Sequence, residues 1–326
     1  MAINQLPLAI RTLFADLLQR LEIALPAGSV YTRRIDDTVY LYAKVPVGND
    51  RIDTFLGRAD DPTVEARAKG IRDGMASAKA RRALVSMLRR AGIAGPDRIL
   101  GTTLDSIAHA GLFRDGAVLV GTAAYMLFEP LVGQRLPAPT LMTGDLDLAT
   151  ARLALTAEPP QSMEQILHRA DPSFTGLMNL DPRMPSWRFR NANDYQVELL
   201  TPIRTRMDSH PMRLHALNAG AAPLQHLSWL ISDPVPTAAL WGAGILINVP
   251  QPAKFAVHKL IIAQRRNPID RVKRTKDLMQ ANALMAALRR EDPFALEDAM
   301  NDARSQGKGG WAERIDRSLK ELELEL

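Results

Sequence analysis

Two aspartates placed two positions apart are the residues of this chain best suited to chemistry. The stretch Thr143–Ala149 reads TGDLDLA, and its alternation of acidic and aliphatic residues predicts a strand. Side chains alternate between the two faces of a strand, so Asp145 and Asp147 share one face and the leucines point into the core. The Cα atoms of these two aspartates are about 6–7 Å apart, and two carboxylates held side by side repel each other unless a cation neutralises them. Oxygen ligands suit Mg²⁺ or Mn²⁺, so the pair indicates a divalent metal site, with a solvated acidic face as the alternative.

Two flanking segments add groups of the same kind. An apolar run ends in Gly121-Thr122, and a helix is predicted directly after it. Gly121 allows close approach of a backbone, and Thr122 offers a hydroxyl and an N–H to a phosphate, although an ordinary turn has the same composition. Downstream, Glu198 is the lone acidic residue of the apolar stretch 195–200. It is either a third carboxylate of the site or an edge-strand residue that faces water.

Positive charge is concentrated near the C-terminal end. The chain has no Lys between Lys79 and Lys254. Residues 254–276 then contain four Lys and four Arg. A predicted helix over 253–266 places Lys259 and Arg266 two turns apart on one face. Fixed positive charge stabilises transferring phosphates. We favour Lys259 as a triphosphate contact, followed by Arg265, Arg266 and Lys276, with a solvated basic face as the alternative.

The elements around these residues predict a mixed α+β chain. A helix is expected over 6–21, a hairpin over 29–33 and 38–45, a third strand over 51–56, and helices from Asp61-Pro62 to about 75 and over 78–91. Further strands are expected over 117–120, 143–149, 187–190, 195–200 and 239–249, with helices over 123–131 and 162–168. Everything after Pro252 is predicted to be helical, over 253–266, 270–290, 292–303 and 311–323. We draw three regions from this pattern: 1–100, 101–250 and 251–326.

Aromatic residues gather in the N-terminal hairpin. Tyr31, Tyr40 and Tyr42 are three of the five tyrosines in the chain, and Arg33 and Arg34 lie beside them. Aromatic and Arg side chains together can bind nucleic acid. The favoured interpretation is that they pack a small sheet against a neighbouring helix.

Composition excludes several classes of protein. The 326 residues include no Cys, which excludes disulfides, thiolate zinc sites, iron–sulfur clusters and cysteine nucleophiles. Walker A, dinucleotide-binding and nucleophile-elbow motifs are absent. No apolar run reaches the length of a membrane span, and no signal peptide is evident, so a cytoplasmic protein is expected. The net charge of +5 is a weak indication of anionic partners.

The order of these motifs resembles the nucleotidyltransferase superfamily, which is built on a palm like that of DNA polymerase β. The resemblance rests on LVGTAAYMLFEPLVG, on TGDLDLA with VELLTP, and on PAKFAVHKLIIAQRR with KRTKDL. It covers about residues 117–281 and is strongest with bacterial nucleotidyltransferase-fold proteins that carry an N-terminal extension. The chain departs from the superfamily pattern in having Gly-Thr instead of Gly-Ser, a wide gap of 24 positions between Gly121 and Asp145, and Glu198 where Asp is commoner.

The resemblance implies a polymerase-β-like palm with a mixed sheet, an N-terminal helix and hairpin region, and a helical C-terminal region. It implies two-metal transfer of NMP from ATP or another NTP to a hydroxyl, with Asp145, Asp147 and Glu198 as metal ligands. Gly121 and Thr122 would then hold phosphates. The acceptor is left open among tRNA or other nucleic acid, a protein and a small molecule, and so is assembly into a homo-oligomer; no membrane partner is expected. The alternatives are a catalytically inactive palm that binds nucleotide or nucleic acid, and a scaffold of unrelated fold.

Overall fold

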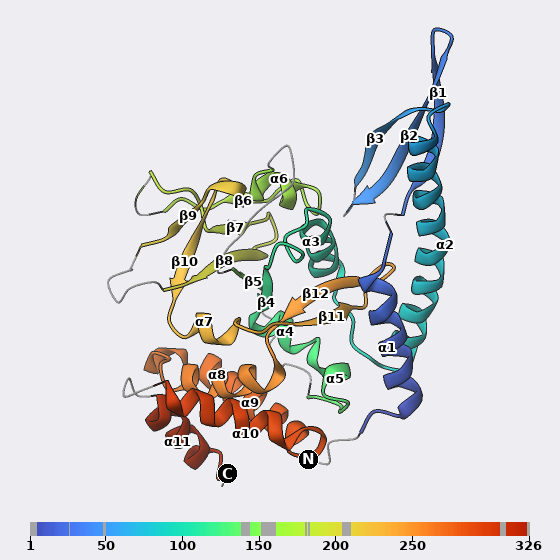
Figure 1. Ribbon diagram of the computed structural model, residues 1–326. Coiled ribbons are helices and arrows are strands. Elements are labelled where there is room, and N and C mark those ends of the chain that lie inside the picture. Colours follow the sequence, from blue (N-terminus) through green and yellow to red (C-terminus); the bar gives the residue numbers. More distant parts are fainter. Residues whose placement is uncertain are drawn as a thin grey trace.

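A computed structural model describes residues 5–25, 27–47, 50–137, 144–150, 161–179, 181, 183–203, 210–306 and 311–324. The chain forms an α+β structure in which a central mixed sheet lies between an N-terminal helix-and-strand region and a group of C-terminal helices (Figure 1). This arrangement confirms the predicted α+β class.

The N-terminal region has two helices and a small antiparallel sheet. Helix α1 (Leu8–Glu22) precedes β1 (Ser29–Ile35), β2 (Thr38–Val47) and β3 (Asp50–Arg58), which pair in sequence order, and α2 (Pro62–Arg90) follows. The turn between β1 and β2 includes Asp36 at φ 52°, a conformation that Asp tolerates well. The Asp61 side chain accepts a hydrogen bond from the Thr63 N–H and so caps α2. The two helices expected over 62–91 are one continuous helix, because Gly70 and Gly74 weaken a helix without ending it.

The central sheet mixes parallel and antiparallel pairs. Its path runs β4 (Val118–Val120), β5 (Asp145–Ala149), β8 (Gln196–Pro202), β10 (Ala219–Leu224) and β9 (Met212–Leu214). Strands β4 and β5 are antiparallel, whereas β5–β8 and β8–β10 are parallel. Strand β7 (Arg188–Arg190) pairs with β8 and with β6 (Thr175–Gly176). The sheet therefore places the predicted Asp and Glu strands side by side.

Short helices connect these strands. They are α3 (Arg98–His109), α4 (Gly121–Tyr125), α5 (Phe128–Leu131), α6 (Met163–His168) and α7 (Leu227–Leu230), with a 3-10 turn over His215–Leu217. The capping box of α6 is present as predicted, with Ser162 and Gln165 bonding each other's backbone N–H groups. The single helix expected over 123–131 is wrong: it is divided into α4 and α5. Helix α3 was not predicted.

The segment expected as one strand over 239–249 is a hairpin. Strands β11 (Val235–Ala239) and β12 (Ile245–Val249) pair antiparallel around the turn that separates them. That turn contains Gly242 at φ +58° and Gly244 at φ +85°, and this left-handed backbone reverses the chain. The apolar composition of 239–249 concealed the reversal.

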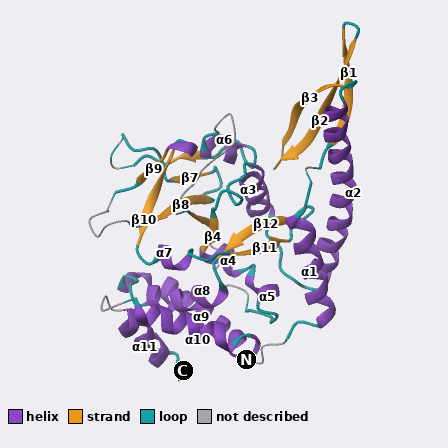
Figure 2. Cartoon of the chain, viewed as in Figure 1, coloured by secondary structure: helices purple, strands orange, loops and turns teal. Residues whose placement is uncertain are grey.

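The C-terminal part is helical, as predicted (Figure 2). It contains α8 (Pro252–Ala263), a 3-10 turn over Pro268–Asp270, α9 (Arg271–Glu291), α10 (Pro293–Ser305) and α11 (Trp311–Glu321). One apolar cluster extends from Leu100 to Leu319 and joins these helices to the central sheet. Among the described helices, none is long and apolar enough to cross a membrane.

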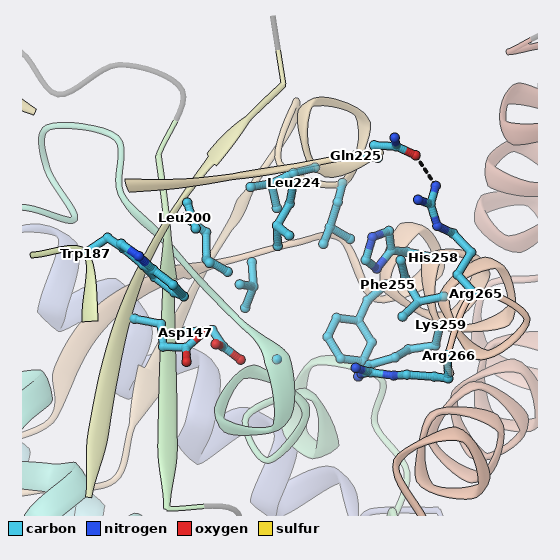
Figure 3. A pocket seen from close by; sticks show the side chains of 17 residues that line it. Asp147, Trp187, Leu200, Leu224, Gln225, Phe255, His258, Lys259, Arg265 and Arg266 are labelled. Atoms are coloured by element: carbon cyan, nitrogen blue, oxygen red, sulfur yellow. Dashed lines mark hydrogen bonds between the residues drawn. The ribbon is translucent and has the colours of Figure 1, made fainter. Parts of the chain in front are cut away.

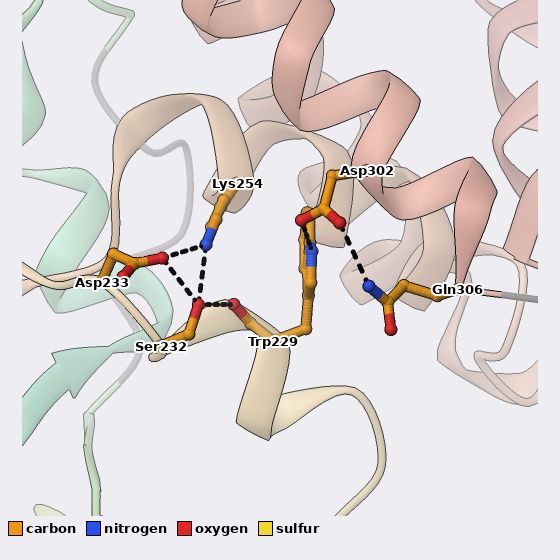
Figure 4. Close-up of polar contacts among 6 residues, drawn as sticks. All are labelled: Trp229, Ser232, Asp233, Lys254, Asp302 and Gln306. Carbon is orange, nitrogen blue, oxygen red and sulfur yellow. Dashed lines mark hydrogen bonds and ion pairs between the residues drawn. The ribbon is translucent and has the colours of Figure 1, made fainter.

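Polar contacts fix α7 to the C-terminal helices (Figure 4). The Trp229 indole N–H donates to Asp302 at 2.7 Å, and the Lys254 ammonium contacts Ser232 and Asp233 at 2.7 and 2.6 Å. These contacts join α7 and the turn after it to α10 and α8. They therefore hold α8 in place beneath the sheet.

Candidate active site

The predicted carboxylates come together at the centre of the sheet. In the parallel β5–β8 pair, Asp147 lies opposite Glu198 and Asp145 lies opposite Gln196. Leu146 and Leu148 are buried, so the predicted alternation of β5 is confirmed. The three carboxylates therefore share one face of two adjacent strands. This placement argues against a scaffold with its aspartates on separate faces.

Gly121 fits closely against Asp147. Strand β4 places Val120 opposite Asp147, and Gly121 then turns the chain away at φ +69°. A Cβ atom on Gly121 would lie 2.1 Å from Asp147 Oδ2, well inside van der Waals contact. Both the backbone conformation and the available space require glycine here.

A cavity of about 410 Å³ opens beside these groups (Figure 3). Asp147 lies on its sheet side, and Phe255, His258, Lys259, Arg265 and Arg266 line the opposite side from α8 and the residues that follow it. The remaining lining is largely apolar and includes Trp187, Leu200, Leu224, Leu227 and Leu230; Gly121 and Glu198 also line the cavity. The cavity thus has Asp147 and Glu198 on one side and the cations, including Lys259, on the other.

Asp277 holds two of the predicted cations. Its buried carboxylate on α9 contacts Lys259 Nζ at 2.6 Å and Arg266 Nε at 2.9 Å. Burial opposes ionisation, but the two cations hold the pKa of Asp277 below its usual range. Sequence reasoning missed this residue, although an Asp directly after Lys276 in a basic stretch was a usable signal.

Thr122 and Lys276 form a second contact behind the cavity. Lys276 Nζ donates to Thr122 Oγ1 at 3.0 Å, and both residues are buried. Burial lowers the pKa of Lys276, and the nearby Lys259 ammonium lowers it further. Neither residue lines the cavity, so this contact supports the turn at Gly121 from behind.

Arg265 and Arg266 differ in their surroundings. Arg265 is exposed and donates hydrogen bonds to Gln225 and to His226 Nε2. Arg266 is partly buried and bound to Asp277. Arg266 is therefore the more firmly held of the two.

Glu198 has a partner that sequence reasoning missed. Arg188 on β7 lies opposite Glu198 in the antiparallel β7–β8 pair, and its Nε is 2.8 Å from Glu198 Oε1. The Arg188 guanidinium also lies over the ring of Trp187 at 4.4 Å. Burial raises the pKa of Glu198, and Arg188 opposes that shift.

Asp147 is the most perturbed carboxylate of the site. Burial raises the pKa of Asp147 to about 6, Glu198 and Asp145 add repulsion, and Lys259 and Lys276 act in the opposite direction. Among the residues that the structure describes, no three His, Cys, Asp or Glu side chains gather closely enough to hold a metal ion by themselves. The three-carboxylate ligand set therefore stays a prediction.

Comparison with known families now adds to this geometry. A family model described as "Nucleotidyltransferase" matches residues 98–305, which is nearly two thirds of the chain. The chain belongs to this nucleotidyltransferase family. A search of curated proteins and a search of solved structures gave no match.

The nucleotidyltransferase match contains the whole candidate site. It begins at the N-terminus of α3 and ends with α10, and all nine predicted site residues lie inside it, from Gly121 to Lys276. The region before residue 98, including α1, α2 and strands β1–β3, lies outside the match.

Proposed function

We propose that this protein transfers NMP from ATP or another NTP to a hydroxyl acceptor and releases pyrophosphate. One observation carries the proposal: Asp147 of β5 and Glu198 of β8 line the same cavity as Lys259 of α8 and the two arginines that follow this helix. An NTP carries a polyanionic tail and an apolar base. The cations suit the tail, the carboxylates suit the reacting phosphate, and the apolar lining suits the base.

The donor set fits a divalent ion that is bound together with the nucleotide. In phosphoryl-transfer sites Mg²⁺ is commonly held by one or two carboxylates plus substrate phosphates, and Asp145 with Asp147 supplies two oxygen donors on one strand face. Burial is the main cause of the elevated pKa of Asp147, and repulsion from Glu198 and Asp145 adds to it; a bound cation would favour the ionised carboxylate. Bound Mg²⁺ or Mn²⁺ supplies charge neutralisation on the phosphates.

The other residues of the site position the nucleotide. Lys259 and Arg266 bind the β- and γ-phosphates, and Asp277 fixes the direction of both side chains. Arg265 is a further cation at the mouth of the cavity. The Gly121 backbone approaches the phosphates closely, and Thr122, held by Lys276, fixes that turn.

The transfer is an in-line displacement. The acceptor oxygen attacks the α-phosphorus, the bond from that phosphorus to the bridging oxygen breaks, and pyrophosphate leaves with the bond electrons. Glu198 accepts the acceptor's proton or completes the ligand set. Either role requires that Arg188 release the carboxylate. Most of the rate enhancement then comes from positioning and charge neutralisation.

We further propose that the central sheet is a palm of the polymerase-β type. In support, α4 follows β4 at the Gly121 turn, and the acidic residues lie on the adjacent β5 and β8 strands. This order matches the arrangement that the sequence resemblance implies.

A second candidate is a catalytically inactive module that binds nucleotide. The ion pair between Arg188 and Glu198 favours it, because a carboxylate neutralised by Arg is a poor metal ligand and a poor base. In this case the cations would still bind an NTP, and no transfer would follow.

The test is incubation of the protein with each α-³²P-labelled NTP and Mg²⁺, with total RNA and total protein as acceptors. Asp147→Asn is the test variant, and Asp298→Asn, at an exposed position on α10, is the matched control. Label that forms with the wild type and the control, and is lost with Asp147→Asn, supports nucleotidyl transfer. NTP binding without label supports the inactive module, and the absence of both rejects the proposal.

A further inference from the structure

The three-stranded sheet β1–β3 has two faces of different chemistry. One face is apolar: Leu41, Ala43 and Leu56 are buried against Val64 and Ala68 of α2. The opposite face carries aromatic and charged side chains, which alternate with the buried ones along each strand. We call this opposite face the aromatic platform. It consists of Tyr31, Arg33, Tyr40, Tyr42, Lys44, Arg51, Asp53, Phe55 and Arg58.

The rings of the platform form one connected surface. Tyr31 stacks on Tyr42 with centroids 5.7 Å apart and an interplanar angle of 20°, and Phe55 contacts Tyr42 at 5.3 Å and Tyr40 at 5.7 Å. The prediction that these tyrosines pack against a helix is wrong, because the alternation of β2 turns Leu41 and Ala43 to α2 instead. Phe55 leaves 55% of its surface exposed.

Cations are interleaved with these rings. The Arg33 guanidinium lies 5.2 Å from the Tyr42 ring and 5.7 Å from the Tyr31 ring. Strand register adds Lys44 opposite Asp53 and Arg51 opposite Pro46. Register also places Arg58 opposite Tyr40, where it pairs with Asp60 at 2.7 Å. The platform therefore has four cations and one carboxylate, a net positive surface beside the exposed Phe55 ring. Figure 1 shows it on strands that stand beside α2 and away from the C-terminal helices.

We propose that the aromatic platform binds single-stranded RNA. Bases stack on aromatic side chains and on Arg guanidinium planes, and the phosphates between bases need nearby cations. Aromatic residues and Arg are also common at protein interfaces, but Lys is depleted there. The excess of cations over carboxylates on the platform therefore favours a polyanion. RNA binding by the platform does not depend on the nucleotidyl transfer proposed above. The further step, that the bound RNA is the acceptor, rests on that proposed function.

Asp53 favours RNA over DNA. Its carboxylate accepts a hydrogen bond from the Tyr31 hydroxyl at 3.1 Å and is exposed. A carboxylate can only accept hydrogen bonds, and the RNA 2′-hydroxyl is a backbone donor that DNA lacks. RNA therefore gains at Asp53 a contact that the DNA backbone cannot make.

The experiment is a fluorescence-anisotropy titration of the full-length protein with a fluorescein-labelled, unstructured 20-nucleotide RNA, without NTP. Phe55→Ala removes the most exposed ring, and we expect affinity to fall about ten-fold. The matched control is Phe294→Ala, since Phe294 is 76% exposed on α10. Arg33→Ala should weaken binding and reduce the slope of log affinity against log salt by about one. Its control is Arg34→Ala, one residue further along β1 and on the other face.

Several outcomes would overturn the proposal. The first is that the wild type does not bind the RNA. The second is that it binds RNA and DNA of the same sequence with equal affinity. The third is that the platform variants and their controls lose RNA affinity equally. Circular dichroism establishes that each variant is folded; should Phe55→Ala unfold, Phe55→Leu keeps an apolar side chain at this position and removes the π-face. RNA binding without labelling of RNA would support RNA binding by the platform and reject RNA as the acceptor of nucleotidyl transfer.

Discussion

At the level of single residues, the position of the Asp147 carboxylate depends on a neighbour that has no side chain. The Cβ of an alanine at position 121 would lie 2.1 Å from Asp147 Oδ2, so Gly121→Ala must displace the carboxylate or the turn. A displacement of about 1 Å in a catalytic group can lower rates about 100-fold. We expect a loss of nucleotidyl transfer of that order, measured as kcat/KM for the NTP.

A control variant for Gly121→Ala distinguishes the effect of backbone strain from that of the steric clash with Asp147. Gly242 has a similar φ of +58°, and a Cβ there would meet no atom within 4 Å. Gly242→Ala should cost about 1 kcal/mol of stability and leave activity unchanged. Equal losses of activity in the two variants would mean that strain, and not the contact with Asp147, causes the defect.

The buried carboxylate of Asp277 organises the cationic side of the cavity. It contacts Lys259 and Arg266, and its replacement leaves both cations without their partner. Asp277→Asn should reduce the free energy of unfolding by about 3–5 kcal/mol and weaken NTP binding, as measured by denaturant titration and by calorimetry.

A surface pair provides the comparison for Asp277. Asp233 contacts Lys254 at 2.6 Å with its own side chain 64% exposed, so Asp233→Asn should cost less than about 1 kcal/mol. A similar cost for both substitutions would contradict the role of burial at Asp277.

At the level of elements, α8 brings His258 to the cavity beside Lys259. Burial lowers the pKa of His258 to about 3, and the nearby Lys259 lowers it further. The unfolded chain therefore binds a proton near pH 6.5 that the folded chain does not bind until about pH 3. Stability conferred by neutral His258 is present above about pH 6.5 and is lost as the pH falls.

His258→Gln should remove this dependence. Between pH 7 and pH 5 the wild type should lose about 2 kcal/mol of unfolding free energy more than the variant, as measured by urea denaturation at each pH. His226, whose pKa burial lowers to about 4, remains in both proteins. Parallel pH profiles for the two proteins would show that His258 is protonated in the folded state.

Local patterns in the sequence predicted the elements and missed most of the pairings. The alternation around Asp145 and Asp147 predicted β5, and Asp-Pro at 61–62 and 292–293 predicted two helix starts, because these signals depend on adjacent residues. Arg188 and Asp277 act through partners 10 and 11 or more residues away, and no local pattern specifies such contacts. Helix α3 has Leu100, Leu104 and Ile107 at helical spacing, but the run Gly101-Thr102-Thr103 has low helix propensity and concealed the helix.

At the level of the whole molecule, apolar clusters and polar contacts connect the regions. The largest apolar cluster includes residues from α3 to α11, so the central sheet and the C-terminal helices should unfold together. The N-terminal region has its own apolar cluster, in which Leu17 and Leu88 pack with Ala238 and Leu240. It therefore meets the rest of the chain at the β11–β12 hairpin.

Glu291 is one of the polar contacts between these parts. At the end of α9, its Oε1 accepts hydrogen bonds from the side chains of Gln5 at 2.8 Å and Gln134 at 2.7 Å, and its Oε2 lies 3.2 Å from Arg11. Gln134 is buried, so the loss of Glu291 leaves its amide unpaired. Removing the partner of a buried polar group costs about 1–3 kcal/mol.

Glu291→Ala should therefore release α1 before the core unfolds. We expect faster hydrogen exchange in α1 than in β5 and β8, and a fall of about 1–3 kcal/mol in unfolding free energy. Glu313→Ala is the control, because Glu313 pairs with Arg317 on one exposed helix face and its loss should leave α1 unchanged. Faster exchange of α1 and β5 by the same factor would show instead that the N-terminal region and the nucleotidyltransferase core form one cooperative unit.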